Sequence, residues 1–179
     1  MGVFTNFIEP AAGLASESRG GVIQIRYVVK TDTSSTSNQS FVDVSGLSVS
    51  ITPTRSDSQI LVTGHITGDG TQSSTRNNMR VKRTYGSTSS VFPAVGNSYG
   101  NRPQAILGFY QGADDNTPMT SGYGFIDAPG TTQTVTYTWQ FQEANGTSNS
   151  VYVNRSSSWT DSSSHMTGSS TIILMEISG

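Results

Sequence analysis

The feature that most constrains the fold of this chain is an alternation of apolar and hydroxyl side chains with a two-residue period. In 47–52, Leu, Val and Ile alternate with Ser and Thr, and in 134–142, Val, Tyr, Trp and Phe alternate with Thr and Gln. Successive side chains of a β-strand point to opposite faces, so this period predicts strands with one dry face. No long stretch follows the period of an amphipathic helix. The sequence therefore predicts an all-β chain.

Runs of this kind recur along the chain between polar turns, at the spacing of roughly 8–12 residues that is typical of sandwiches and barrels. They include a short mixed run at 105–110 and a closing run at 172–177. We expect about nine or ten short strands in a single antiparallel β-sandwich, for which jelly-roll and immunoglobulin-like topologies both remain open.

Two turns indicate which strands are neighbours. Pro53 and the polar residues after it predict a turn that joins 41–52 to 59–66 as a hairpin or meander. Asn145-Gly146 stands at a hairpin position, from which 151–153 returns beside the preceding strand.

The polar surface of the chain is built from hydroxyl groups more than from charges. Only 12% of the 179 residues are charged, about half the usual share, whereas Ser and Thr together number 52. The formal net charge is −2, which differs from the high net charge of disordered chains. Such a surface suits contact with other protein copies or with glycans.

Several functional classes are disfavoured by what the sequence lacks. The chain has no cysteine, which excludes disulfides, thiolate catalysis and Cys-ligated metals. Its 10 Lys and Arg residues leave no basic footprint for nucleic acid. No apolar run reaches the roughly 20 residues of a membrane helix, and the N-terminus has no secretory signal pattern. We expect no cofactor, no nucleic-acid partner and no membrane insertion.

The composition changes at Gly20-Gly21, which divides the chain into an N-terminal arm, 1–21, and a β-sandwich domain, 22–179. Phe4, Phe7 and Ile8 form an apolar cluster in the arm. One interpretation is a docking arm whose aromatic side chains insert into a partner subunit. The other is a loose terminus.

The residues that are able to carry catalysis or bind a metal ion are few. His65 lies mid-strand, on the face opposite its apolar neighbours, and is expected to be structural. His165 stands near Asp161 and Ser164, but the members of a catalytic triad normally come from separate elements. Asp114-Asp115 lacks the ligand spacing of a calcium loop. We expect no catalytic residue and no metal site, and hence no enzyme.

Two aromatic residues in polar loops are the better candidates for binding. Tyr99 lies in 97–101 and Trp159 in the Ser-rich stretch 156–164. A loop aromatic flanked by hydrogen-bonding groups is able to stack on a sugar ring or anchor a protein contact. The alternative is that each ring folds back onto the sandwich.

The closing run 172–177 is apolar on both faces, which favours a central strand or one buried at an interface. Its candidate subunit-contact residues are Ile172, Leu174, Met175 and Ile177.

Six blocks of the sequence, in this order, carry a family resemblance. They are VKTDT at 29–33, FVDVSGLSVSITP at 41–53, QILV at 59–62, FIDAPGTT at 125–132, VYVNRS at 151–156 and STIILMEI at 170–177. They resemble small virion proteins of tailed bacteriophages, in particular aquatic and cyanophage-type proteins described as tail-fibre or other external structural proteins. The resemblance covers residues 22–178 and is weaker over 70–104.

This resemblance implies a non-enzymatic β-domain on the virion exterior, made in the host cytoplasm. Its partners would be itself, as a homotrimer, other virion proteins, and a host-surface glycan or protein. The first hypothesis is a tail-fibre or fibre-tip subunit for host attachment. The alternative is a capsid decoration protein that docks through the arm 1–21, and a glycan-degrading spike is less favoured.

Overall fold

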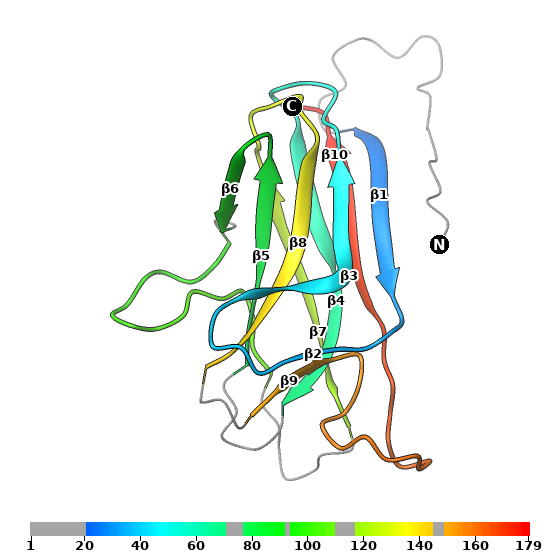
Figure 1. Cartoon of the computed structure of the whole chain (residues 1–179). Helices are drawn as coiled ribbons and strands as arrows, with labels where there is room; N and C mark the ends of the chain where they lie inside the picture. Colours follow the sequence, from blue (N-terminus) through cyan, green and yellow to red (C-terminus); the bar gives the residue numbers. More distant parts are fainter. Residues whose placement is uncertain (1–20, 71–76, 92–93, 110–116, 145–148) are drawn as a thin grey trace.

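The structure, a computed structural model of the chain, describes residues 21–70, 77–91, 94–109, 117–144 and 149–179. Within these residues the chain forms ten β-strands and no helix (Figure 1). They are β1 (Val22–Lys30), β2 (Ser34–Thr36), β3 (Val42–Ile51), β4 (Gln59–Gly70), β5 (Asn77–Tyr85), β6 (Thr88–Val91), β7 (Met119–Asp127), β8 (Val135–Glu143), β9 (Val151–Val153) and β10 (Ser170–Ile177). The all-β prediction is confirmed.

The strands form two antiparallel sheets that pack face to face. The six-stranded sheet has the order β1-β10-β4-β9-β2, and β7 pairs with the other edge of β4. One edge of β4 serves two partners in succession, β10 along Gln59–His65 and β9 along Gly68–Gly70. The four-stranded sheet has the order β3-β8-β5-β6 and lies in front of the other in Figure 1. The predicted sandwich is therefore confirmed.

The pairing of the eight longer or central strands is nested. Without the short β2 and β9, the first strand pairs with the last, β1 with β10, and the second with the seventh, β3 with β8. Inside them β4 pairs with β7 and β5 with β6. This is the jelly-roll arrangement, in which a folded ribbon of four antiparallel pairs wraps into two sheets. Of the two topologies that the sequence left open, the chain adopts the jelly roll.

The strand pairings expected from the two turns are wrong. β3 and β4 do not form a hairpin, because the connection 52–58 carries the chain from one sheet to the other. β9 pairs with β2 and β4 instead of β8; Asn145-Gly146 lies outside the described residues. Of the strand expected at 105–110, the described residues 105–109 form a single bridge, between Leu107 and Met79; residue 110 lies outside the described residues. A two-residue period fixes the face of a side chain but not the partner of its strand.

The hydrophobic core lies between the two sheets and draws on inward-facing positions of both. Its largest members include Trp139 and Tyr137 of β8, both 0% exposed. Tyr123 of β7 meets Trp139 edge-on, with ring centroids 4.8 Å apart, a favoured geometry for aromatic pairs. The buried apolar residues are Val44, Leu47, Ile51, Ile60, Val62, Ile66, Met79, Val81, Phe109, Val135, Tyr137, Trp139, Phe141, Val151, Val153, Ile172 and Leu174.

A buried polar cluster ties the sheets together near the end of β7. The Asp127 carboxylate accepts a hydrogen bond from the Tyr137 hydroxyl at 2.7 Å and pairs with Arg83 at 2.6 Å. Burial, reinforced by the hydrogen bond to Asp127, raises the pKa of Tyr137, which therefore stays a donor. Because β7 belongs to one sheet and β5 and β8 to the other, the cluster links them directly.

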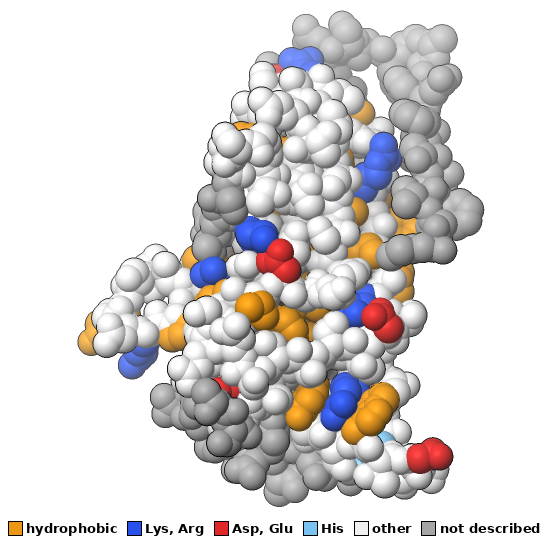
Figure 2. All heavy atoms as spheres, in the orientation of Figure 1, with side chains coloured by type: hydrophobic (Ala, Val, Ile, Leu, Met, Phe, Trp, Pro, Cys, Tyr) orange, Lys and Arg blue, Asp and Glu red, His pale blue; other side chains and the backbone are white. Residues whose placement is uncertain are grey.

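The outer face of the four-stranded sheet carries a ladder of hydroxyl pairs. Along β3 and β8 and just beyond their ends, three cross-strand pairs lie 2.8 Å apart: Ser48–Thr138, Ser50–Thr136 and Thr52–Thr134. In Figure 2 the upper part of this face is almost free of hydrophobic and charged side chains. The alternating hydroxyls of the sequence thus form a polar stretch of sheet surface, exposed at the pairs Ser50–Thr136 and Thr52–Thr134.

Candidate functional site

Long connections of the jelly roll gather toward the end that carries β2 and β9 (Figure 1). Their described parts are 31–41, 94–109 with 117–118, and 154–169. The connections at the opposite end are shorter and comprise 52–58, 86–87 and 128–134. Tyr99 and Trp159 both belong to the long connections, where binding residues on a rigid scaffold are usually found.

Tyr99 stands on a loop that is closed by its own backbone hydrogen bonds. The Arg102 amide donates to the Tyr99 carbonyl at 3.1 Å, and the Gly96 amide donates to the Ala105 carbonyl at 3.2 Å. Gly100 occupies the turn with a φ of +54°, a conformation that glycine adopts at little cost. The Tyr99 ring is 73% exposed. It does not fold back onto the sandwich, so the binding interpretation survives for this residue.

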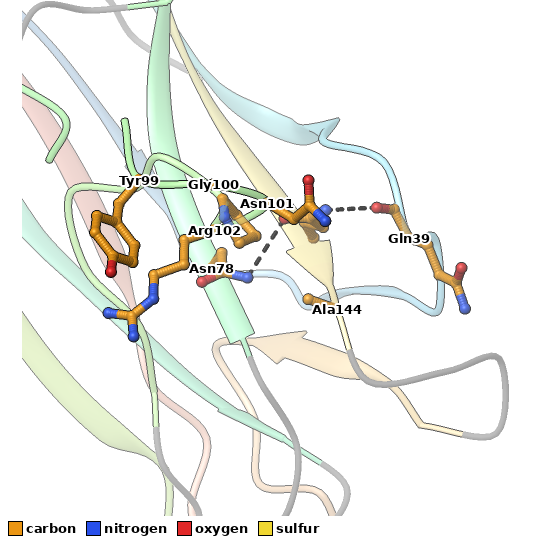
Figure 3. A pocket seen from close by; sticks show the side chains of 9 residues that line it. Gln39, Asn78, Tyr99, Gly100, Asn101, Arg102 and Ala144 are labelled. Atoms are coloured by element: carbon orange, nitrogen blue, oxygen red, sulfur yellow. Dashed lines mark hydrogen bonds between the residues drawn. The ribbon is translucent and has the colours of Figure 1, made fainter. Parts of the chain in front are cut away.

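This loop closes one side of a hollow of about 720 Å³, which we call the Tyr99 hollow (Figure 3). Residues of β5 and β8 and of the connection before β3 form its other side. The lining residues are Gln39, Asn78, Tyr99, Gly100, Asn101, Arg102, Pro103, Gln142 and Ala144. Such a volume lies within the usual range of small-ligand pockets.

Amide side chains form the floor of the Tyr99 hollow. Asn78 Nδ2 donates to Gln142 Oε1 at 3.4 Å, and Gln142 Nε2 donates in turn to the Gln39 carbonyl (Figure 3). This chain of hydrogen bonds spans from β5 across β8 to the connection before β3. Because each amide group both donates and accepts, the floor offers both functions to a polar ligand.

Arg102 gives the Tyr99 hollow a positive charge. Its guanidinium lies 5.1 Å from the centre of the Tyr99 ring, within the range of a cation–π contact. Arg102 has no carboxylate partner among the described residues, and none of the described residues that line the hollow is an Asp or Glu. The described part of the hollow is therefore an exposed site with hydrogen-bonding groups and a cation that no described carboxylate neutralises.

Trp159 lies over a second, smaller hollow of about 300 Å³. The Arg155 guanidinium is stacked between two rings, 4.3 Å from the centre of Tyr152 and 4.6 Å from that of Trp159. Trp159 is 55% exposed, so its ring remains accessible. The hollow is lined by Trp159, Thr160, Asp161, Ser162, His165, Met166 and Thr167, and it differs from the Tyr99 hollow in carrying a carboxylate.

Both histidines contact hydroxyl groups. His165 Nε2 lies 3.0 Å from Ser158 Oγ and its Nδ1 lies 3.2 Å from Ser164 Oγ. His65 Nδ1 lies 3.2 Å from Thr171 Oγ1, on the outer face of the six-stranded sheet as expected. Among the described residues no hydrogen bond joins His165 to Asp161, so the three residues of the loop do not assemble as a triad.

No group of three His, Asp or Glu side chains within the described ranges is placed to hold a metal ion. Asp114-Asp115 lies outside these ranges, as do Phe4, Phe7 and Ile8 of the arm. The described part of the chain contains no helix with the length and apolar character of a membrane span.

β10 divides its apolar side chains between two faces. Ile172 and Leu174 are 0% exposed and belong to the core, whereas Met175 and Ile177 are half-buried on the outer face of the sheet. The prediction that Ile172 and Leu174 contact a second subunit is corrected, because their own chain encloses both side chains. For Met175 and Ile177 the subunit contact stays a prediction.

Apolar side chains continue from β10 across its neighbours on this outer face. One row of directly paired residues crosses four strands and consists of Ile25, Met175, Leu61 and Ile126. Tyr27, Val29 and Ile126 are 40%, 45% and 56% exposed, respectively. We call this set the outer apolar face; its members are Ile25, Tyr27, Val29, Leu61, Ile126, Ile173 and Met175. Two neighbouring positions of β7, Gly122 and Gly124, have no side chain and leave the surface flat.

The sequence reasoning missed Arg102, Gln142 and Asn78. The turn Tyr99-Gly100-Asn101-Arg102 carried a signal for Arg102, because the first and last residues of a tight turn lie close together. No comparable signal existed for the other two, which reach the hollow through pairings between distant strands.

No family model matches the chain, and no curated protein matches it. Ten chains of solved structures match, among them one from a structure of infectious bursal disease virus, Gx strain. The likeness to that chain has a TM-score of 0.39 and 13% sequence identity, and it covers 96% of this chain and 43% of that one. This chain thus spans less than half the length of the matched chain. The jelly-roll assignment rests on the strand pairings themselves.

Proposed function

We propose that this chain is a non-enzymatic structural subunit of a virus particle, namely a tail-fibre or fibre-tip domain of a tailed phage. It assembles with copies of itself, as a homotrimer, through the outer apolar face. Its long loops contact the host surface. The outer apolar face is the observation that carries this proposal.

An exposed apolar surface that crosses four strands favours a protein partner. Burial of apolar area contributes roughly 25 cal/mol per Å², and large contiguous patches on a single chain usually mark interaction sites. The partially exposed Tyr27 and Ile126 lie on opposite edges of the patch, so a partner would cover its full width. A flat patch with glycine positions on β7 suits a second flat protein surface.

The opposite face of the sandwich also supports packing of the subunits through the outer apolar face. It carries the hydroxyl ladder and, lower down, the Lys82–Asp43 ion pair at 2.6 Å. A subunit with one apolar and one polar face packs through the first and exposes the second.

A second candidate is a capsid decoration protein, which the one-sided distribution of apolar residues also favours. The outer apolar face would then lie on the shell, and the free chain would be a monomer. The position of the protein on the virus particle distinguishes the fibre proposal from the decoration proposal. Antibody labelling of purified particles is expected at the tail, whereas labelling confined to the capsid would contradict the fibre proposal. Absence from particles would contradict both candidates.

A further inference from the structure

We infer that the Tyr99 hollow binds an acidic sugar unit, a uronic or sialic acid residue, of a surface glycan. The inference deepens the proposed host contact, on which its biological meaning rests. The binding itself depends only on the residues of the hollow.

The charge of the hollow selects an acidic ligand. Arg102 has no acidic partner among the described residues, and the described lining of the hollow includes no carboxylate. Guanidinium groups bind carboxylates with two parallel hydrogen bonds. A sugar carboxylate at Arg102 would supply a partner that none of the described residues provides.

The floor and the ring of the hollow suit the rest of a sugar. The side chains of Asn78 and Gln142, with Asn101 beside them, offer amide groups to the hydroxyls of a pyranose (Figure 3). The Tyr99 ring, at 73% exposure, supplies an apolar surface with a polar tip. The self-closed loop holds Tyr99 and Arg102 on the same side of its turn. Little ordering is then needed on binding.

The Trp159 hollow provides an internal contrast. Arg155, which stacks on Trp159, lies between the rings of Tyr152 and Trp159 and donates to the Ser156 carbonyl at 3.0 Å. Asp161 lines the hollow and repels a second carboxylate. Acidic sugars are therefore expected at Tyr99 and not at Trp159.

The test is a calorimetric titration of the full chain with 3′-sialyllactose, with a glucuronic-acid disaccharide and with lactose. At least one acidic probe is expected to bind with a dissociation constant of about 1 mM, and lactose at least about tenfold more weakly. Arg102→Gln is expected to weaken the acidic probe about tenfold or more without affecting lactose. Tyr99→Ala weakens the acidic probe, whereas the matched loop variant Trp159→Ala leaves it unchanged.

The inference is overturned if neither acidic probe binds, if lactose binds equally well, or if Trp159→Ala and not Arg102→Gln abolishes binding. All three substituted side chains are exposed in loops, so the variants are expected to fold, which circular dichroism checks. The particle location is measured separately. The titrations therefore test the sugar-binding inference, and the labelling of particles tests the proposed structural role, each independently of the other.

Discussion

At the scale of single residues, Gly64 of β4 lies against the backbone of β10 with no room for a side chain. Its φ is +147°, and a Cβ atom there would lie 2.3 Å from the Thr171 carbonyl oxygen. Gly64→Ala is expected to lower the free energy of unfolding by about 1–3 kcal/mol, because the strands would have to move apart. Gly122→Ala on β7 is the matched control, since its Cβ would lie 3.9 Å from the nearest atom. Equal losses in urea denaturation would contradict this packing.

Glu176 makes stability depend on acid pH. Burial raises its pKa, but hydrogen bonds from Gln24 and Thr54 outweigh burial and lower it overall. A lowered pKa in the folded state means that the carboxylate stabilises the fold above its unfolded pKa of about 4.3. This contribution is lost as the pH falls through the lower folded value.

Glu176→Gln is accordingly expected to lower the free energy of unfolding at pH 7 by about 1–3 kcal/mol. It is also expected to flatten the loss of stability below about pH 4.3. Chemical denaturation between pH 7 and pH 3 measures both effects. Asp161→Asn, the same chemical change at an exposed loop position, is the control. The account fails if both variants keep the pH dependence of the wild type.

At the scale of elements, β10 has one face in the core and the other on the outer apolar face. Leu174→Ala is expected to cost about 2–5 kcal/mol, the range for cavities in a packed core. Met175→Ala on the adjacent, half-buried position should cost roughly 1 kcal/mol or less in the single chain. Urea denaturation at low protein concentration compares the two, and a larger loss for Met175→Ala would refute the assignment of faces.

The same scale explains which elements could be predicted from the sequence. Side-chain alternation is local, so it located β3, β4, β8 and β10 and assigned inner and outer residues correctly at positions such as His65. Strand partners depend on the wrapping of the whole ribbon, which is why the expected β3–β4 hairpin was wrong. The Tyr99 hollow could be predicted only in part for the same reason. Its aromatic residue was evident in the sequence, but its amide floor arises from the pairing of β5 with β8.

At the scale of the whole molecule, the two outer faces of the sandwich differ in chemistry. One carries an apolar row across four strands, and the other carries three hydroxyl pairs. In the proposed assembly the apolar face would pack against other copies and the hydroxyl face would meet solvent. The long loops at one end are where we propose contact with the host surface.

The central claim is that copies of the chain assemble through the outer apolar face, and light scattering at micromolar concentration tests it directly. The wild type is expected at three times the 19.0 kDa of one chain. Lysines at the cross-strand pair Tyr27 and Ile173 (Y27K with I173K) should give the monomer mass, because charges do not pack at an apolar interface. Lysines at the matched pair Ser50 and Thr136 of the opposite face (S50K with T136K) should leave the trimer intact. A monomeric wild type, or a trimer that survives Y27K with I173K, would contradict the claim.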